Sequence, residues 1–144
     1  MNETSVRGGY ACFTTAQLWA LCMLASEKRL SLAAVKIYLA GKEMLERRTG
    51  TTGQKLYREG EITGLTSLSG PIVAKGLAEL HQHELMSFSG ESIIIHDAAV
   101  DELENAPFGT ARNRLIPIPR RLIRILSAHN KKNEILVTLI HCAR

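Results

Sequence analysis

Five arginines lie within thirteen residues of this sequence, and no acidic residue stands among them. A guanidinium group presents several N–H donors in one plane and pairs well with phosphate oxygens, so such a cluster suits contact with a phosphate backbone. We predict a phosphate-binding surface formed by Arg112, Arg114, Arg120, Arg121 and Arg124. Two alternatives remain, a solvated charged face and internal contacts with the acids of residues 79–104.

The 144 residues carry a net charge of +4, which is unevenly distributed. Residues 1–50 carry seven Lys or Arg and four Asp or Glu, residues 51–104 carry three and nine, and residues 105–144 carry eight and one, giving +3, −6 and +7. Phosphate neutralisation supplies most non-specific DNA affinity, so the basic last segment favours a nucleic-acid partner. The acids of the middle segment cluster from Glu79 onwards and are expected to point away from that partner.

The sequence contains few residue patterns that indicate catalysis, metal binding or disulfide formation. The sequence has no nucleophile elbow, no nucleotide-binding loop and no metal-ligand set, so we expect no enzymatic activity, no cofactor and no metal site. Cys12, Cys22 and Cys142 lack CxxC spacing and are expected to be buried free thiols. The apolar runs are too short to span a bilayer and residues 1–7 do not have the form of a signal peptide, which predicts a cytoplasmic protein.

The elements that must position the basic residues are mainly helices. Thr14, with Gln17 three residues later, forms a capping-box pattern that predicts a helix ending near Ser26. This helix is apolar nearly all round and must be covered, either by the core or by a second subunit. Ser31 predicts the start of a second helix, over 32–47, that is central to the core.

A further pair of helices is expected in the middle of the chain. The first runs over 54–65, and the second opens at Ser69, whose side chain can cap it, with Pro71 where a missing N–H costs nothing. An apolar stripe on the second helix predicts its packed face: Ile72, Val73, Gly76, Leu77 and Leu80. The opposite side carries Gly70, Ala74, Lys75, Glu79 and Gln82.

The remaining elements are a hairpin and two more helices. Strands are expected over 86–89 and 92–96, followed by a linker over 106–113. A helix near Pro119 has an apolar stripe of Leu122, Ile125 and Leu126. The last helix, capped by Asn133, has the stripe Ile135, Leu136, Leu139 and Ile140. That stripe needs a cover: the helix after Thr14, another subunit, or a downstream segment.

Several residues of the central stretch share the pattern of a known domain. They are Glu61 and Ile62 on the supporting helix, the turn over 66–68, the opening Ser69-x-Pro71-x-Val73, Lys75-Gly-Leu-x-Glu-Leu80, and the hairpin over 86–97. Together they resemble a winged helix-turn-helix domain, as found in bacterial transcription regulators and plasmid replication initiators. Residues 30–48 also resemble the first helix of such domains, so the resemblance covers about half of the chain.

The resemblance implies where DNA would be contacted. In that family the helix that starts near Ser69 enters the major groove, and the hairpin lies along the adjacent backbone or minor groove. Ser69 and Lys75 would then contact bases, and Ile72 would touch a thymine methyl group. Lys55 and Arg58 would hold phosphates. Because few base-reading side chains follow Ser69, DNA shape is the alternative source of specificity. The acidic hairpin tip opposes phosphate and favours a structural role for the wing.

We therefore predict a mainly α fold with a small β-hairpin. A flexible tail over 1–13 precedes a winged helix-turn-helix domain with a three-helix core over 14–105. A basic helical extension over 106–144 follows, as a dimerisation or DNA-contact arm. The predicted function is sequence-specific binding of double-stranded DNA by a homodimer, in transcription regulation or in replication and maintenance of a mobile element such as a plasmid. The alternative is a winged-helix module that binds another protein, through the acidic 79–104 face or its apolar helices.

Overall fold

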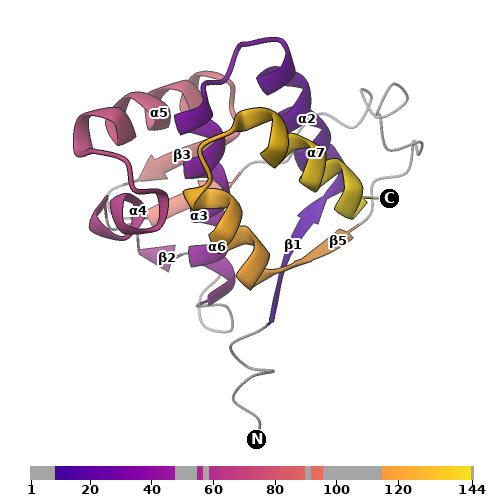
Figure 1. The fold of residues 1–144 in the computed structure, drawn as a ribbon. Helices are drawn as coiled ribbons and strands as arrows, with labels where there is room; N and C mark the ends of the chain where they lie inside the picture. Colours follow the sequence, from indigo (N-terminus) through magenta and orange to yellow (C-terminus); the bar gives the residue numbers. More distant parts are fainter. Residues whose placement is uncertain (1–8, 48–54, 57–58, 90–91, 96–114, 144) are drawn as a thin grey trace, which may run out of the picture.

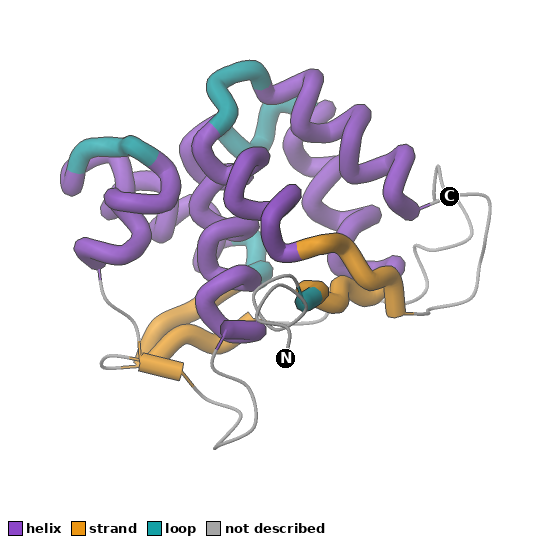
Figure 2. Tube along the Cα trace, turned by 60° about the horizontal axis from the view of Figure 1, so that its bottom comes forward, coloured by secondary structure: helices purple, strands orange, loops and turns teal. Residues whose placement is uncertain are grey.

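The computed structural model describes residues 9–47, 55–56, 59–89, 92–95 and 115–143. Within these ranges six helices and five short strands follow one another, so the protein is mainly helical (Figure 1). The strands form a two-stranded ribbon of β1 and β5 and a three-stranded sheet in the order β2-β4-β3. Figure 2 shows the two sheets apart from each other, at the lower side of the helices in that view.

Helix α3 (Leu32–Arg47) is the element around which the others pack. The Ser31 hydroxyl oxygen accepts the Ala34 N–H at 3.2 Å, which caps the helix start as predicted. Apolar residues on several sides of α3 are buried, so it can serve α5, α6 and β1 together: Val35, Ile37, Tyr38, Leu39 and Met44. The prediction of a central helix over 32–47 is confirmed.

Helix α2 (Thr15–Ser26) begins with the predicted capping box. The Thr14 N–H donates to Gln17 Oε1 and the Gln17 N–H donates to Thr14 Oγ1, both at 3.0 Å. Most of the apolar surface of α2 is buried within the chain. The core therefore covers this helix, which was the first of the two alternatives.

Helix α7 (Lys132–Ala143) packs against α2, so the helix after Thr14 covers its apolar stripe. Three residues of that stripe are buried and the fourth is partly buried: Ile135, Leu136, Leu139 and Ile140. Asn133 does not cap this helix. The Ile135 N–H donates to the Lys131 carbonyl at 3.2 Å, so the helix has already begun before Asn133.

Strands β1 (Tyr10–Thr14) and β5 (Leu115–Pro119) pair antiparallel, with Tyr10 opposite Pro119. The predicted tail over 1–13 is therefore wrong for its last residues. Alternate residues of the ribbon face the core and are buried: Ala11, Phe13, Ile116 and Ile118. The two prolines of β5 occupy exposed positions of the alternation, where an absent N–H is tolerated in an edge strand.

The residues of β5, α6 and α7 join the same apolar cluster as α2 and α3. The described part of the predicted extension over 106–144 is thus continuous with the rest of the core. Two buried lysines of α3 tie it to distant segments. Lys36 Nζ donates to Asn130 Oδ1 at 2.9 Å, and Lys42 Nζ donates to the Cys12 carbonyl at 2.7 Å and lies 4.9 Å from the Phe13 ring centroid. Burial lowers the pKa of Lys36.

The middle of the chain holds β2 (Lys55–Leu56), α4 (Glu59–Thr66) and α5 (Gly70–Gln82). The predicted helix over 54–65 is wrong at its start, because Lys55 and Leu56 pair with the hairpin. The hairpin strands β3 (Met86–Ser89) and β4 (Ser92–Ile95) lie where they were predicted, and β2 adds to β4. A two-residue strand has no period of its own, and only its partner defines it.

Candidate nucleic-acid interface

A tight turn joins α4 to α5. Thr66, the last residue of α4, is buried, and its hydroxyl donates to the Ile62 carbonyl at 2.6 Å and accepts the Leu68 N–H at 3.3 Å. Ser67 has a φ of 60°, in the left-handed region, and its N–H donates to the Thr63 carbonyl at 2.9 Å. These bonds end α4 within one residue and redirect the chain into α5.

Ser69 is the N-cap residue of α5, as predicted, but its side chain makes no capping hydrogen bond. A cap side chain bonds the N–H of the second or third helical residue. Pro71 occupies the second position and has no N–H, so one of the two donors is missing. The capping role predicted for the Ser69 side chain is therefore wrong, although the helix starts at the expected place.

Helix α5 approaches α3 closely through Gly76. A Cβ atom on Gly76 would lie 2.5 Å from Ile37 Cδ1, nearer than packed carbon atoms come. Val73, Gly76 and Leu80 are buried on this side, as the stripe predicted. Ile72 departs from the stripe, since its side chain is 46% exposed. The close approach fixes which side of α5 faces solvent.

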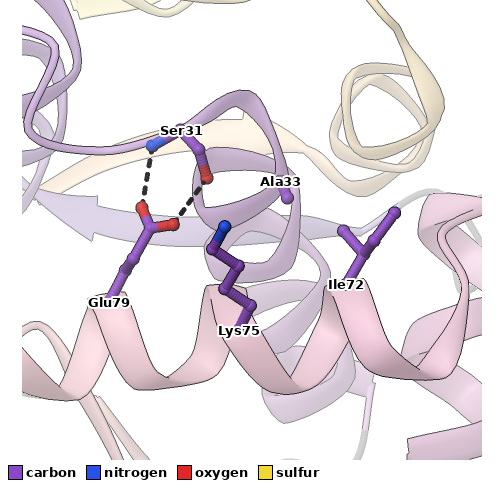
Figure 3. A pocket seen from close by; sticks show the side chains of 6 residues that line it. Ser31, Ala33, Ile72, Lys75 and Glu79 are labelled. Atoms are coloured by element: carbon purple, nitrogen blue, oxygen red, sulfur yellow. Dashed lines mark hydrogen bonds between the residues drawn. The ribbon is translucent and has the colours of Figure 1, made fainter.

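One side of α5, next to its contact with α3, borders a pocket of about 200 Å³ together with the start of α3 (Figure 3). Ile72 and Lys75 point from α5 towards the opposite wall, which is formed by Ser31, the residue before α3, and Ala33 of α3. Glu79 accepts two hydrogen bonds, from the Ser31 N–H at 2.9 Å and from its hydroxyl at 3.0 Å. Ser31 and Glu79 are 48 residues apart, so no local pattern could reveal this contact.

The arginines of α6 (Arg120–Ala128) do not all face solvent. Arg120 Nη2 lies 3.2 Å and Arg124 Nε 3.0 Å from Glu43 Oε2. The Glu43 side chain is fully buried, and those of Arg120 and Arg124 are 12% and 42% exposed. A buried carboxylate needs such partners. Internal pairing was among the alternatives for these arginines, but the acid belongs to α3 and not to residues 79–104. Arg121 is exposed.

This ion cluster explains a second difference from the sequence prediction. Ile123 and Leu126 of α6 are buried, Leu122 is partly buried, and Ile125 is 64% exposed, so the stripe predicted through Ile125 is wrong. Arg120 and Arg124 must face α3 to reach Glu43, and Ile123 lies on the same side of the helix. In the sequence, Glu43 is recognisable only as an acid within a helix that is apolar on several sides. This pattern does not predict which residues pair with it.

The other predicted phosphate contacts fall outside what the structure describes. Arg58, Arg112 and Arg114 lie outside the described residues, and the structure describes only the backbone of Lys55. The described site residues thus divide into two groups. Ser69, Ile72 and Lys75 at α5 and Arg121 of α6 are exposed, while Arg120 and Arg124 pair with the buried Glu43 of α3.

Cysteine and histidine residues form no metal-ligand cluster in the part of the chain that the structure describes. Cys22 is buried, and burial raises its pKa to about 12; Cys12 and Cys142 are half-buried, and burial also raises the pKa of Cys142. All three are free thiols. Within the described ranges no three His, Cys, Asp or Glu residues come together as metal ligands.

Comparison with protein-family models, curated proteins and solved structures finds no match to this chain. Among the described residues, no helix combines the length and the apolar character needed to cross a bilayer. Conclusions about function therefore depend on the chain's own geometry and chemistry.

Proposed function

We propose that this protein binds double-stranded DNA through helix α5, as a homodimer, in transcription regulation or in replication and maintenance of a mobile element. One observation carries the proposal. Helix α5 follows α4 through a tight turn, is packed against α3 through Gly76, and presents Ile72 and Lys75 to solvent. A rigidly held helix with an open outer side is the unit that enters a major groove in helix-turn-helix proteins.

The order of elements adds support. Strand β2 precedes α4, the hairpin β3–β4 follows α5, and β2 pairs with β4, so a small sheet is attached to the helix pair. A winged helix-turn-helix domain would contain these parts. In the proposal Ser69 and Lys75 approach bases and Ile72 approaches a thymine methyl group.

The proposal assigns phosphate contacts more narrowly than the sequence did. Lys55, Arg58, Arg112, Arg114 and Arg121 keep the proposed role. Arg120 and Arg124 are excluded from this role, because turning them towards DNA would break their ion pairs with the buried carboxylate of Glu43. The few base-reading groups on α5 favour a second candidate, a module that binds another protein, and the experiment below separates the two.

The proposal is tested by fluorescence anisotropy of labelled random duplex DNA with the full chain, at several salt concentrations. DNA binding should weaken steeply as salt rises, with a slope of roughly 0.9 per neutralised phosphate. The mass of the protein in solution, measured in the same buffers, should be that of a dimer. No binding even at low salt would contradict the DNA proposal and leave the protein-binding candidate.

The base-reading role of Lys75 is tested by a sequence selection with the wild type and with Lys75→Ala. The wild type should enrich a preferred site, and the variant should enrich a different or weaker one, with a loss of about 1–3 kcal/mol confined to the contacted base pair. Arg121→Ala is the matched control, since it removes one exposed positive charge and should lower affinity for every sequence alike. An equal loss on every sequence from Lys75→Ala would contradict base reading.

A further inference from the structure

Two turns that are distant in sequence meet at the start of α3. The α2–α3 turn contains Lys28 and Arg29, and the α6–α7 turn leads through Lys131 into Lys132. Lys132 Nζ donates to the Leu30 carbonyl at 3.3 Å, which joins the two turns. Figure 1 shows the α2–α3 turn at the top of the molecule and the α6–α7 turn below it, in front of α3. The four basic residues of these two joined turns are here termed the turn cluster.

The turn cluster is held in place by hydrogen bonds. The Lys28 N–H donates to the Ala25 carbonyl at 3.1 Å and the Arg29 N–H to the Leu24 carbonyl at 2.8 Å. The second turn is anchored by the bond from the buried Lys36 to Asn130 at 2.9 Å. The backbones that carry the cluster are thus fixed against the core, while the long basic side chains extend from them.

Three of the four side chains of the cluster are exposed, and Lys132, which donates to the Leu30 carbonyl, is partly buried. Those of Arg29 and Lys131 are 62% and 74% exposed, and Lys28 is also exposed. Glu27 lies 3.5 Å from Arg29, and Glu134 lies 3.9 Å from Lys131 and 2.7 Å from His129. Exposed pairs of this kind contribute little, so they can be exchanged for phosphate. Four basic residues face two acids, which leaves the surface positive.

The α2–α3 turn of the cluster is next to the side of α5 that carries Lys75 and Glu79. Ser31, two residues after Arg29, is bonded through both its N–H and its hydroxyl to Glu79 of α5, and it lines the same pocket as Lys75. The carboxylate of Glu79 therefore accepts hydrogen bonds within the protein. A helix in a major groove about 12 Å wide has a phosphate backbone close on each side. In the proposed complex one of those backbones would run past the α2–α3 turn, which the Ser31–Glu79 bonds hold beside α5.

We infer that the turn cluster, Lys28, Arg29, Lys131 and Lys132, is a phosphate-backbone contact surface for DNA bound by α5. This inference rests on the proposed function. It moves the main phosphate contacts of the described residues from α6 to the two turns. Because these groups would contact phosphates and not bases, they would contribute affinity without sequence preference.

The test compares full-length wild type with Lys28→Gln/Lys131→Gln by fluorescence anisotropy on random duplex DNA over several salt concentrations. The two substitutions leave the Lys132 and Lys36 hydrogen bonds in place. The variant should show a salt slope smaller by about two units, from roughly 0.9 per phosphate, and binding weaker by roughly tenfold or more at ~0.1 M salt. Lys28→Arg/Lys131→Arg keeps the charge and should bind as the wild type does. A thermal melt confirms that each variant is folded.

The outcomes separate this inference from the proposed function. Wild-type binding with an unchanged slope in the glutamine variant would overturn the inference and leave the function standing. A slope lowered by about one unit in Arg121→Ala, beside an unchanged slope in the glutamine variant, would place the backbone along α6 instead of the two turns. No DNA binding by the wild type would overturn the proposed function and the inference together.

Discussion

Helices α5 and α6 both pack on α3, yet they use their charged residues in opposite ways. On α6, Arg120 and Arg124 turn inward to the buried Glu43. On α5, the buried contact with α3 is made by apolar residues and Gly76, and Lys75 stays exposed beside that contact. Helix α6 thus has more basic residues than α5, yet two of its three arginines pair with an acid inside the protein.

The difference has a simple electrostatic origin. A carboxylate removed from water costs several kcal/mol unless cations or donors replace its hydration. Glu43 lies on a helix that is buried on several sides, so the nearest arginines must serve it before they can serve a ligand. Basic residues counted along a sequence therefore contribute to the positive potential of the surface only if they are not paired with a buried acid.

The largest effect should come from removing the acid that turns α6 inward. Glu43→Gln leaves Arg120 with a nearly buried charge and should lower the free energy of unfolding by about 3 kcal/mol, the lower end for a broken buried pair because Arg124 can turn to solvent. Urea unfolding followed by circular dichroism measures this loss. Arg121→Ala, on the exposed side of the same helix, should change stability by less than about 0.5 kcal/mol. Equal effects of the two would remove the distinction between inward and outward arginines.

On α5 the contact with α3 is steric, and a methyl group should disturb it. Gly76→Ala forces the Ile37 δ-methyl to move inside the core, a cost of about 1–3 kcal/mol that is partly offset by about 1 kcal/mol of helix propensity. We expect a net loss of about 1 kcal/mol in urea unfolding. Adding Ile37→Val, which removes that methyl, should make Gly76→Ala neutral or favourable.

Gly64→Ala is the matched control for Gly76→Ala. Beyond its own helix backbone, a Cβ atom at Gly64 would meet nothing within 4 Å, so this substitution should raise stability by up to about 1 kcal/mol through propensity alone. If both alanine substitutions stabilise the protein equally, α5 is not held closely against α3 at Gly76.

The smallest effect concerns the polar contact that joins α5 to the start of α3. Glu79→Ala removes two hydrogen bonds to the exposed Ser31 and should lower stability by about 0.5 kcal/mol. A double-mutant cycle with Ser31→Ala should show that the second substitution costs less once the first is present. Additive losses would mean that the two residues act independently.

Some parts of the fold could be predicted because their signals are local. The capping box at Thr14 and Gln17 contains both partners of its hydrogen bonds within four residues. The helix over 32–47 was predicted from its cap and its 3.6-residue period, and the hairpin from two short runs around a glycine. The same period put Ile72 in the packed stripe of the helix after Ser69 and Lys75 on the opposite side, whereas the structure exposes both and places them at one pocket.

Other parts depend on contacts between distant segments. Strand β1 is defined by β5, more than one hundred residues later, and β2 by β4. The rotation of α6 depends on Glu43, and the turn cluster depends on the bond from Lys132 to Leu30. Each of these partners is farther along the chain than a helical turn or a hairpin spans. The periodicity of the sequence therefore cannot predict these contacts.

The sequence by itself determined where most helices begin, which residues of α5 and α7 are apolar enough to pack, and that the chain has a basic balance. Only the tertiary structure decided which basic groups remain at the surface. The reason is that a charge's environment is set by its nearest neighbours in space, and those neighbours come from segments that folding brings together. Glu43 keeps Arg120 and Arg124 inside, while Lys28 and Lys131 stay exposed on turns that meet beside α5.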